Sequence, residues 1–266
     1  VTLGAQSFDA AQLQTLGRAH GVDDIADGVA LLRGGGIQNV GLDLMYSLPG
    51  QSLSSWERSL QAAIALGVDH VSSYALSFEA GTPFGRRLAA GDLAEVDEEL
   101  QRAMYDLAIE TLGAAGLAQY EISNFAKPGR ESRHNLVYWH NHSYAAIGPA
   151  AAGYVAGRRW TNHPDLDAWL AAVEAGTAPP CDEESLSGAL AMGETIMLGL
   201  RLMEGLSLAE FAGRYGQELN EVFPQSLTKH LRQGTLLQSD GRLRVSREAL
   251  FISDSIFADF IDEASP

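Results

Sequence analysis

Two hydrophobic patterns alternate along the first 125 residues. Short apolar segments predict strands at residues 1–6, 37–46, 68–77 and 117–123. Apolar residues that recur every three or four positions predict helices at residues 10–20, 23–33, 54–67 and 97–116. Strands that alternate with helices in this way predict an α/β domain with a parallel sheet and right-handed crossovers.

Local signals predict where these helices begin and end. Asp9 and Asp97 each precede a helical segment and are good N-cap residues. Ser54 and Glu57 have the spacing of a capping box. The run 34–36 is three glycines that follow a helix and precede a strand. It therefore predicts a C-cap and turn, because a phosphate-binding loop would need a helix after it.

The predicted sheet is incomplete. Four strands are too few for a closed barrel, and an open parallel sheet leaves its edge strands unpaired. The chain also opens with Val1, inside a predicted strand and without a charged-then-apolar signal segment. We therefore expect residue 1 to be an internal point of a longer protein, with the missing strands supplied upstream or by a partner.

Beyond residue 125 the pattern changes twice. Residues 126–180 are less regular, with a short helix predicted at 165–175 and a linker at 176–180. The later pattern predicts helices at 186–202, 207–215, 221–233 and 249–261, and strands at 236–238 and 243–245. The two strands flank Asp240-Gly241, a hairpin signal. We therefore predict three regions: 1–125, a connecting region 126–180, and a winged-helix-like module at 181–266.

The charge balance limits the choice of partners. Lys+Arg total 18 and Asp+Glu total 34, a formal net charge of −16. A sequence-independent grip on nucleic acid needs a basic face, so we expect no nucleic-acid partner even though winged-helix folds often bind DNA. The one cysteine, Cys181, cannot form an intramolecular disulfide or a multi-thiolate metal site. We interpret it as a linker residue of a cytoplasmic protein.

Asp43 is the first candidate for chemistry, because it interrupts the apolar run at 40–50. It either caps a loop or holds a ligand at the carboxyl end of a parallel sheet, where α/β folds keep their sites. Gln6 ends the first predicted strand and Arg18 lies in the following helix, so the three side chains could converge on a ligand with a carboxylate and hydroxyl groups. The alternative is that Gln6 is a capping or surface residue and Arg18 is a solvated helix residue.

The second candidate is the segment from Tyr120 to His142. It carries His134, Asn135, Tyr138 and Trp139, followed by two more histidines, and could ligate iron or line a planar aromatic ligand. The alternative is that the aromatic residues anchor a core and the histidines are on the surface. The chain contains no HExxH, GxSxG or GxxxxGK[ST] pattern, so zincin, serine-hydrolase and P-loop functions have no support.

Together these segments resemble the radical S-adenosylmethionine family of oxygen-independent coproporphyrinogen III oxidase. The resemblance runs in order through the chain and includes the C-terminal module. The segments that carry it are Gly4–Phe8, Leu16–His20, Asp43–Gln51, Tyr120–Ala126 and His134–Trp139. The string His134-Asn135-x-x-Tyr138-Trp139 is similar to the branch of heme chaperones.

The resemblance implies an α/β fold, a partial (β/α) radical-SAM barrel followed by the winged-helix-like module, and a [4Fe-4S] cluster that cleaves S-adenosylmethionine. It assigns Asp43 to the ribose hydroxyls, Arg18 to the methionine carboxylate and Gln6 to the same ligand. The backbone of Tyr74 and Ala75 would lie beside the adenine. The resemblance also makes His134, Asn135, Tyr138 and Trp139 candidates for contact with heme.

Several departures from the family pattern bear on these expectations. The Cys-x3-Cys-x2-Cys ligands of the cluster have no counterpart, so we expect them upstream of residue 1 and no metal ligand in this chain. Ser47 stands where the family turn favours glycine. The string 150–153 is Ala-Ala-Ala-Gly where many relatives have a Gly-Ala-His-Ser type string, so Ala152 offers no histidine.

From this resemblance we expect a radical SAM heme chaperone that delivers heme to hemoproteins. Association with membranes would be peripheral and through those clients. The first alternative is the oxidase itself, which decarboxylates two propionates of coproporphyrinogen III by means of a 5′-deoxyadenosyl radical. The second is a non-catalytic remnant, since this chain alone lacks the cluster ligands.

Overall fold

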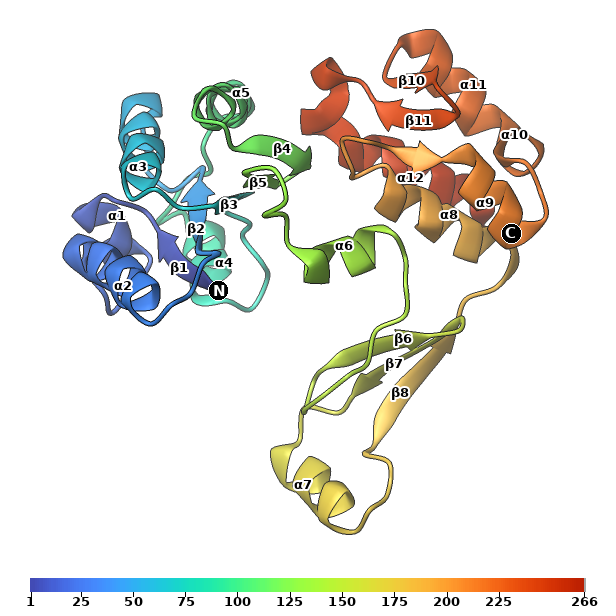
Figure 1. The fold of residues 1–266 in the computed structure, drawn as a ribbon, viewed down its shortest axis with the longest axis horizontal. Coiled ribbons are helices and arrows are strands. Elements are labelled where there is room, and N and C mark those ends of the chain that lie inside the picture. The colour runs from blue at the N-terminus through green and yellow to red at the C-terminus, as the bar shows by residue number, and fades with distance from the viewer. Residues whose placement is uncertain (266) are drawn as a thin grey trace. The chain divides into compact units, whose positions relative to one another are not determined.

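The computed structural model of the chain describes residues 1–265 and consists of two compact units, Val1–Glu131 and Ser132–Pro266 (Figure 1). Each unit has its own sheets and its own apolar core, and each is described by itself below. Within residues 1–265 no helix is both long and apolar enough to cross a membrane.

The first unit is built on a five-stranded sheet with the order β1-β2-β3-β5-β4. Its strands are β1 (Thr2–Gln6), β2 (Gly41–Tyr46), β3 (His70–Ala75), β4 (Ala118–Glu121) and β5 (Asn124–Ala126). The pairs β1–β2 and β2–β3 are parallel, as the strand–helix alternation predicts. The α/β fold and the partial parallel barrel predicted from the sequence are therefore confirmed in this unit.

The prediction of one strand over 117–123, parallel to its neighbour, is wrong. The segment makes β4, turns at residues 122–123 and returns as β5, which lies antiparallel to both β3 and β4. Glu121 closes the turn, because its Oε1 accepts hydrogen bonds from the Ser123 amide at 2.8 Å and from the Asn124 side chain. The turn contains no glycine, so the hydrophobic pattern predicts a single strand. The hydrogen bonds of the Glu121 side chain divide the segment into two strands.

Helices α2 (Val22–Gly34), α3 (Leu53–Ala65) and α5 (Glu98–Ala114) pack against strands β1 and β2 of this sheet. The unit also contains α1 (Ala10–Thr15) and α4 (Pro83–Ala89), and α4 buries none of its residues. Leu42, Val71 and Phe125 lie in register on neighbouring strands and are fully buried on the helix-covered face. Trp56 of α3 is also fully buried, and its indole N–H donates to the Met104 carbonyl of α5 at 2.8 Å. Burial of this row drives the sheet and helices together.

The helix ends test the predicted caps. Asp9 accepts from backbone amides of α1 and Asp97 accepts from the Leu100 amide, so both predicted N-caps are confirmed. Gly35 caps α2 and Gly36 has a φ of 84°, which confirms the predicted turn. The capping box of α3 is made by Ser52 and Ser55, two residues earlier than predicted. Several serines in this segment can cap, and tertiary packing of Ser55 against Gln12 selects the register.

The second unit contains a three-stranded antiparallel sheet that the sequence pattern missed. It consists of β6 (Ala152–Val155), β7 (Arg158–Asn162) and β8 (Cys181–Ser185). Helix α7 (Leu166–Glu174) joins β7 to β8, close to its predicted position. Cys181 was interpreted as a linker residue, but it pairs with Asn162 at the start of β8. Strand β8 is acidic and mostly exposed, so it has no apolar alternation for the sequence pattern to detect.

The rest of this unit has the helices and hairpin of the predicted winged-helix-like module. Its elements are α6 (Arg133–Trp139), α8 (Gly188–Gly199), β9 (Leu206–Ser207), α9 (Leu208–Tyr215), α10 (Leu219–Val222), α11 (Pro224–Gln233), β10 (Leu236–Ser239), β11 (Arg242–Val245), a 3-10 helix η1 (Arg247–Ile252) and α12 (Ser253–Ala264). The hairpin of β10 and β11 turns at Asp240-Gly241, and β9 completes its sheet, so this prediction is confirmed.

The helix predicted at 221–233 is two helices instead of one. Pro224 begins α11, and the residue before it, Phe223, leaves the helical region with φ −123° and ψ 54°. A proline disfavours helical geometry at the preceding residue, which separates α10 from α11. Phe223 is fully buried and packs edge-on against Phe260 of α12 at 5.8 Å, so the break is anchored in the core.

Ser47 should tolerate glycine unusually well. It has a φ of 59°, and its buried hydroxyl has no hydrogen-bond partner within residues 1–265. Left-handed geometry costs an L-residue about 1–2 kcal/mol, and an unsatisfied buried hydroxyl about 1–3 kcal/mol. We therefore expect Ser47→Gly to raise the free energy of unfolding by about 1 kcal/mol in urea titrations, after the roughly 0.5–1 kcal/mol entropy cost of glycine. Ser54→Gly, in the first turn of α3, should instead lower it; equal losses in both would contradict this account.

Asp69 should make the first unit sensitive to acid. Its carboxylate lies 2.5 Å from Arg33 and 3.2 Å from Lys127, and it accepts from the Val40 amide. Burial raises its pKa, but these hydrogen bonds and charges lower the pKa by more, so the net shift is downward. The carboxylate therefore stabilises the fold fully above its unfolded pKa of about 3.9, and this contribution is lost as pH falls through the lower folded value.

The variant Asp69→Asn should accordingly lose about 1.5–3 kcal/mol of unfolding free energy at pH 7, the range for hydrogen bonds to a charged group. The difference from wild type should shrink in urea titrations as pH falls below about 4. Asp92→Asn, at an exposed loop position, is the matched control, with little expected effect. A difference that stays constant down to pH 3 would show that the charge of Asp69 is not responsible.

Candidate functional site

The uncovered face of the first sheet carries a row of polar and small residues. Gly4, Asp43 and Ser72 lie in register on β1, β2 and β3, and Asn124 continues the row on β5. Side chains of residues in register point to the same side of a sheet, so this row faces away from the apolar row beneath the helices. A parallel sheet with one apolar face and one polar, glycine-containing face is suited to hold a polar ligand.

Gln6 and Arg18 meet above Gly4. A Cβ atom on Gly4 would lie 2.7 Å from Gln6 Nε2 and 3.2 Å from Arg18 Nη2, so a larger residue there would displace the ends of both side chains. Arg18 Nη2 also lies 3.4 Å from the Gly4 carbonyl oxygen. Since Asp43 is the neighbour of Gly4 across the sheet, the structure brings together the three residues that the sequence singled out.

The backbone explains how Gln6 and Arg18 reach this position. Gln6 has a φ of 64°, and the pairing of β1 with β2 shifts by one residue between Gly4 and Gln6. Helix α1 ends at Thr15, five residues earlier than predicted, so Arg18 lies in the loop after Gly17 and not in a helix. Such an irregularity at the end of a strand redirects a side chain, a device common next to binding sites.

Asp43 is electrostatically unusual. Burial raises its pKa above the ordinary aspartate value, and a hydrogen bond from the Ser72 side chain offsets part of that shift. The group remains partly accessible. A half-buried carboxylate that keeps free lone pairs is well placed to accept hydrogen bonds from a ligand diol or ammonium.

Tyr74 and Ala75 form the carboxyl end of β3. Tyr74 pairs with Met45 and Ala75 with Tyr46, two and three positions beyond the Asp43–Ser72 pair. The Tyr74 side chain is 41% exposed. These two residues therefore lie at the strand end where α/β folds place ligands, and their role beside an adenine stays a prediction.

The two halves of the implied cofactor site differ in how well the residues fit. The polar face of the first sheet offers a carboxylate, an amide and a guanidinium. It also has a glycine at a place where an added Cβ would fill the space. This set of groups suits S-adenosylmethionine. The cluster does not fit, because its three thiolates cannot come from a chain with one cysteine. Moreover, within residues 1–265 no three His, Cys, Asp or Glu side chains are grouped to hold a metal ion.

Part of the second predicted segment forms α6, and its candidate residues lie in two separate groups. Tyr138 OH lies 2.8 Å from His134 Nε2, and the Tyr138 ring packs edge-on against Tyr144 at 4.6 Å. His134 is exposed. Trp139 lies apart from this pair under the Arg201 guanidinium, 4.5 Å from its ring centroid. Asn135 lies in the first turn of α6, where its backbone amide is capped by Ser132.

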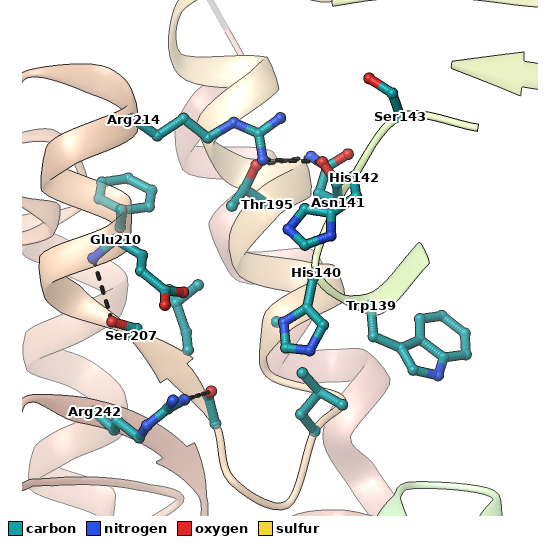
Figure 2. Close-up of a pocket in the computed structure, with 15 residues that line it drawn as sticks. Trp139, His140, Asn141, His142, Ser143, Thr195, Ser207, Glu210, Arg214 and Arg242 are labelled. Atoms are coloured by element: carbon teal, nitrogen blue, oxygen red, sulfur yellow. Dashed lines mark hydrogen bonds between the residues drawn. The ribbon is translucent and has the colours of Figure 1, made fainter. Parts of the chain in front are cut away.

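A cavity of about 510 Å³ in the second unit escaped the sequence analysis (Figure 2). Its lining includes Trp139, His140 and His142 from the end of α6 and the loop after it, and Arg214 and Arg242 from α9 and β11. These residues come from segments up to about a hundred positions apart, so no local motif joins them. The histidines of the 134–142 segment were the one signal that pointed toward it.

Residues 186–252 match the family model described as the HemN C-terminal domain. The solved structure of coproporphyrinogen III oxidase (HemN) from Escherichia coli, a radical SAM enzyme, superposes with a TM-score of 0.79 at 16% identity, over 97% of this chain and 63% of that one. This likeness defines the fold class: that of the corresponding part of a radical SAM coproporphyrinogen oxidase.

Curated relatives narrow the class further. The heme chaperone HemW of Bacillus subtilis is 33% identical over 263 residues, which cover 99% of this chain and 69% of that protein. The heme chaperone HemW of Mycobacterium tuberculosis is 38% identical over 243 residues, covering 91% of this chain and 62% of that protein. The chain therefore belongs to the radical SAM HemW family and spans about two thirds of the length of these relatives.

Asp43→Asn should weaken S-adenosylmethionine binding in the longer, cluster-containing protein expected to carry this chain. Removing the charge while keeping the shape should cost one charge-assisted interaction, about tenfold or more in affinity by calorimetry. Asp92→Asn, an exposed loop position, is the matched control, and the melting temperature checks that the fold is intact. Unchanged affinity in Asp43→Asn would reject the ribose role.

Proposed function

We propose that this chain is the S-adenosylmethionine- and heme-binding portion of a radical SAM heme chaperone. The observation that carries the proposal is the match to curated heme chaperones, which extends over 99% of the chain at 33% identity. The geometry supports it in two places, the polar face of the first sheet and the His134–Tyr138 pair on α6.

In this proposal the polar face binds S-adenosylmethionine. Asp43 accepts hydrogen bonds from the ribose hydroxyls, and Arg18 pairs with the methionine carboxylate through its planar fork. Gln6 closes the same site above Gly4, and the backbone of Tyr74 and Ala75 flanks the adenine. The [4Fe-4S] cluster would supply the open iron that binds the methionine group, with its thiolate ligands contributed from sequence upstream of residue 1.

Heme would bind first at α6. His134 presents an exposed imidazole, and the hydrogen bond to Tyr138 fixes the orientation of the ring. Tyr138 and Trp139 offer aromatic surface for a planar macrocycle, and Asn135 offers an amide. A chaperone must also release its cargo, and an exposed site permits transfer to a client hemoprotein in the cytoplasm.

The second candidate function is oxygen-independent coproporphyrinogen III oxidase. Its support is the fold, shared at 16% identity, which does not define the reaction. The His134-Asn135-x-x-Tyr138-Trp139 string favours the chaperone. A non-catalytic remnant is the third candidate, favoured by the single cysteine of this chain.

A heme titration of the chain, followed by the Soret absorbance, tests the proposal. We expect saturable heme binding, and about tenfold weaker binding in His134→Ala, the loss of about one strong contact. His163→Ala removes another partly exposed histidine, paired with Asp182, and should bind like wild type. Anaerobic turnover of coproporphyrinogen III by the cluster-containing protein, without heme binding, would establish the oxidase instead. If the protein neither binds heme nor turns over coproporphyrinogen III, the non-catalytic remnant is the remaining candidate.

A further inference from the structure

The cavity in the second unit has no assigned role. It lies between the loop after α6, helices α8 and α9, and strands β9 and β11 (Figure 2). Its volume of about 510 Å³ falls inside the range of roughly 300–1,000 Å³ that is typical of cofactor and ligand sites. His134 is not among the residues that line it, so the cavity is separate from the His134–Tyr138 pair.

The wall contains two neighbouring imidazoles. The rings of His140 and His142 are stacked, with centroids 5.5 Å apart and planes 25° apart. His140 Nε2 lies 3.8 Å from Glu204 Oε1, too far for a hydrogen bond. Neither ring nitrogen of His142 has a hydrogen bond within residues 1–265, so its lone pair is available to a ligand. Two imidazoles without hydrogen-bond partners beside a cavity point to a metal-containing ligand or a proton donor.

Glu210 is the one acidic side chain among the residues that line the cavity. Figure 2 shows its carboxylate extending from α9 toward the two imidazoles. A carboxylate that faces a histidine can accept from one ring N–H and direct the other nitrogen at a metal. These three groups do not themselves form a metal-holding cluster, so a bare metal ion is not the ligand that they suit.

Two arginines also line the cavity. Arg214 Nη1 donates to the Asn141 carbonyl at 3.0 Å and Nη2 donates to the Tyr154 hydroxyl at 3.2 Å. Arg242 Nη1 donates to the Gly205 carbonyl at 2.8 Å, and its Nη2 lies 3.5 Å from Glu204 Oε2. These contacts hold both guanidinium groups in place and leave the remaining N–H groups of each available. Guanidinium forks pair bidentately with carboxylates. Leu202, Leu206 and Phe211 supply the apolar part of the wall.

We propose that this cavity is a second heme subsite, which takes the macrocycle edge-on against the apolar wall, the propionates on Arg214 and Arg242, and the iron on His142. The proposal rests on the proposed heme function and adds where the cargo is held. Trp139 lines the cavity and ends the helix that carries His134, so α6 connects the exposed site with the half-open cavity.

The axial ligand can be tested by heme titration of the whole chain. We expect His142→Ala, and more strongly the double variant His140→Ala/His142→Ala, to shift the Soret maximum and weaken binding about tenfold or more. Added imidazole should restore the wild-type spectrum in these variants, because it can refill the vacated ligand position. A structural loss would not be rescued in this way. His163→Ala is the matched control, and melting temperatures check the fold.

The carboxylate contacts are tested by the ratio of affinities for heme and heme dimethyl ester. Wild type should prefer the free acid about tenfold, and Arg242→Gln should lose most of that preference. The ratio is insensitive to a general loosening of β11.

The outcomes separate the two proposals. Unchanged spectra and affinity in the double histidine variant, together with loss in His134→Ala, would overturn the second subsite and keep the heme function. No heme binding by the wild-type chain would overturn both. Weaker heme binding in the double histidine variant, restored by added imidazole, would support the second subsite.

Discussion

The in-register parallel pairing of β1, β2 and β3 is the constraint on which the first unit depends. A shift by one residue would exchange the two faces of the sheet and place the Asp43 carboxylate on the apolar, helix-covered face. The fully buried residues Leu42 and Val71 oppose that shift, because they would have to leave the core. The same burial that fixes the fold therefore also fixes the ligand-facing side of the sheet.

Irregular backbone completes the site that this pairing begins. The left-handed geometry of Gln6 and the register shift beside it bring a side chain from the end of β1 over Gly4. The loop after α1 brings Arg18 to the same place. In regular strands these side chains would point elsewhere. The sheet therefore fixes the position of Asp43, and the irregular backbone at its edge brings Gln6 and Arg18 to the same place.

The second unit contains two candidate ligand sites that differ in exposure. It combines an exposed His134–Tyr138 pair with a half-open cavity, and α6 contributes to both. An exposed site favours exchange with a partner, and a cavity that surrounds more of the ligand favours its retention. A carrier of a reactive cofactor needs both properties, which gives the arrangement a physical rationale within the proposed function.

The sequence by itself determined the alternation of strands and helices at the start of the chain, the helix caps at Asp9 and Asp97, the Asp240-Gly241 hairpin and the motifs at Gln6, Arg18, Asp43 and His134. These depend on neighbours along the chain or on residue type, which local patterns record. Only the tertiary structure decided that residues 118–126 fold back as two strands, that the acidic β8 joins a sheet, and that residues of α6, α8, α9 and β11 line one cavity. Each of these depends on contacts between distant segments, and such contacts leave no periodic trace in the sequence.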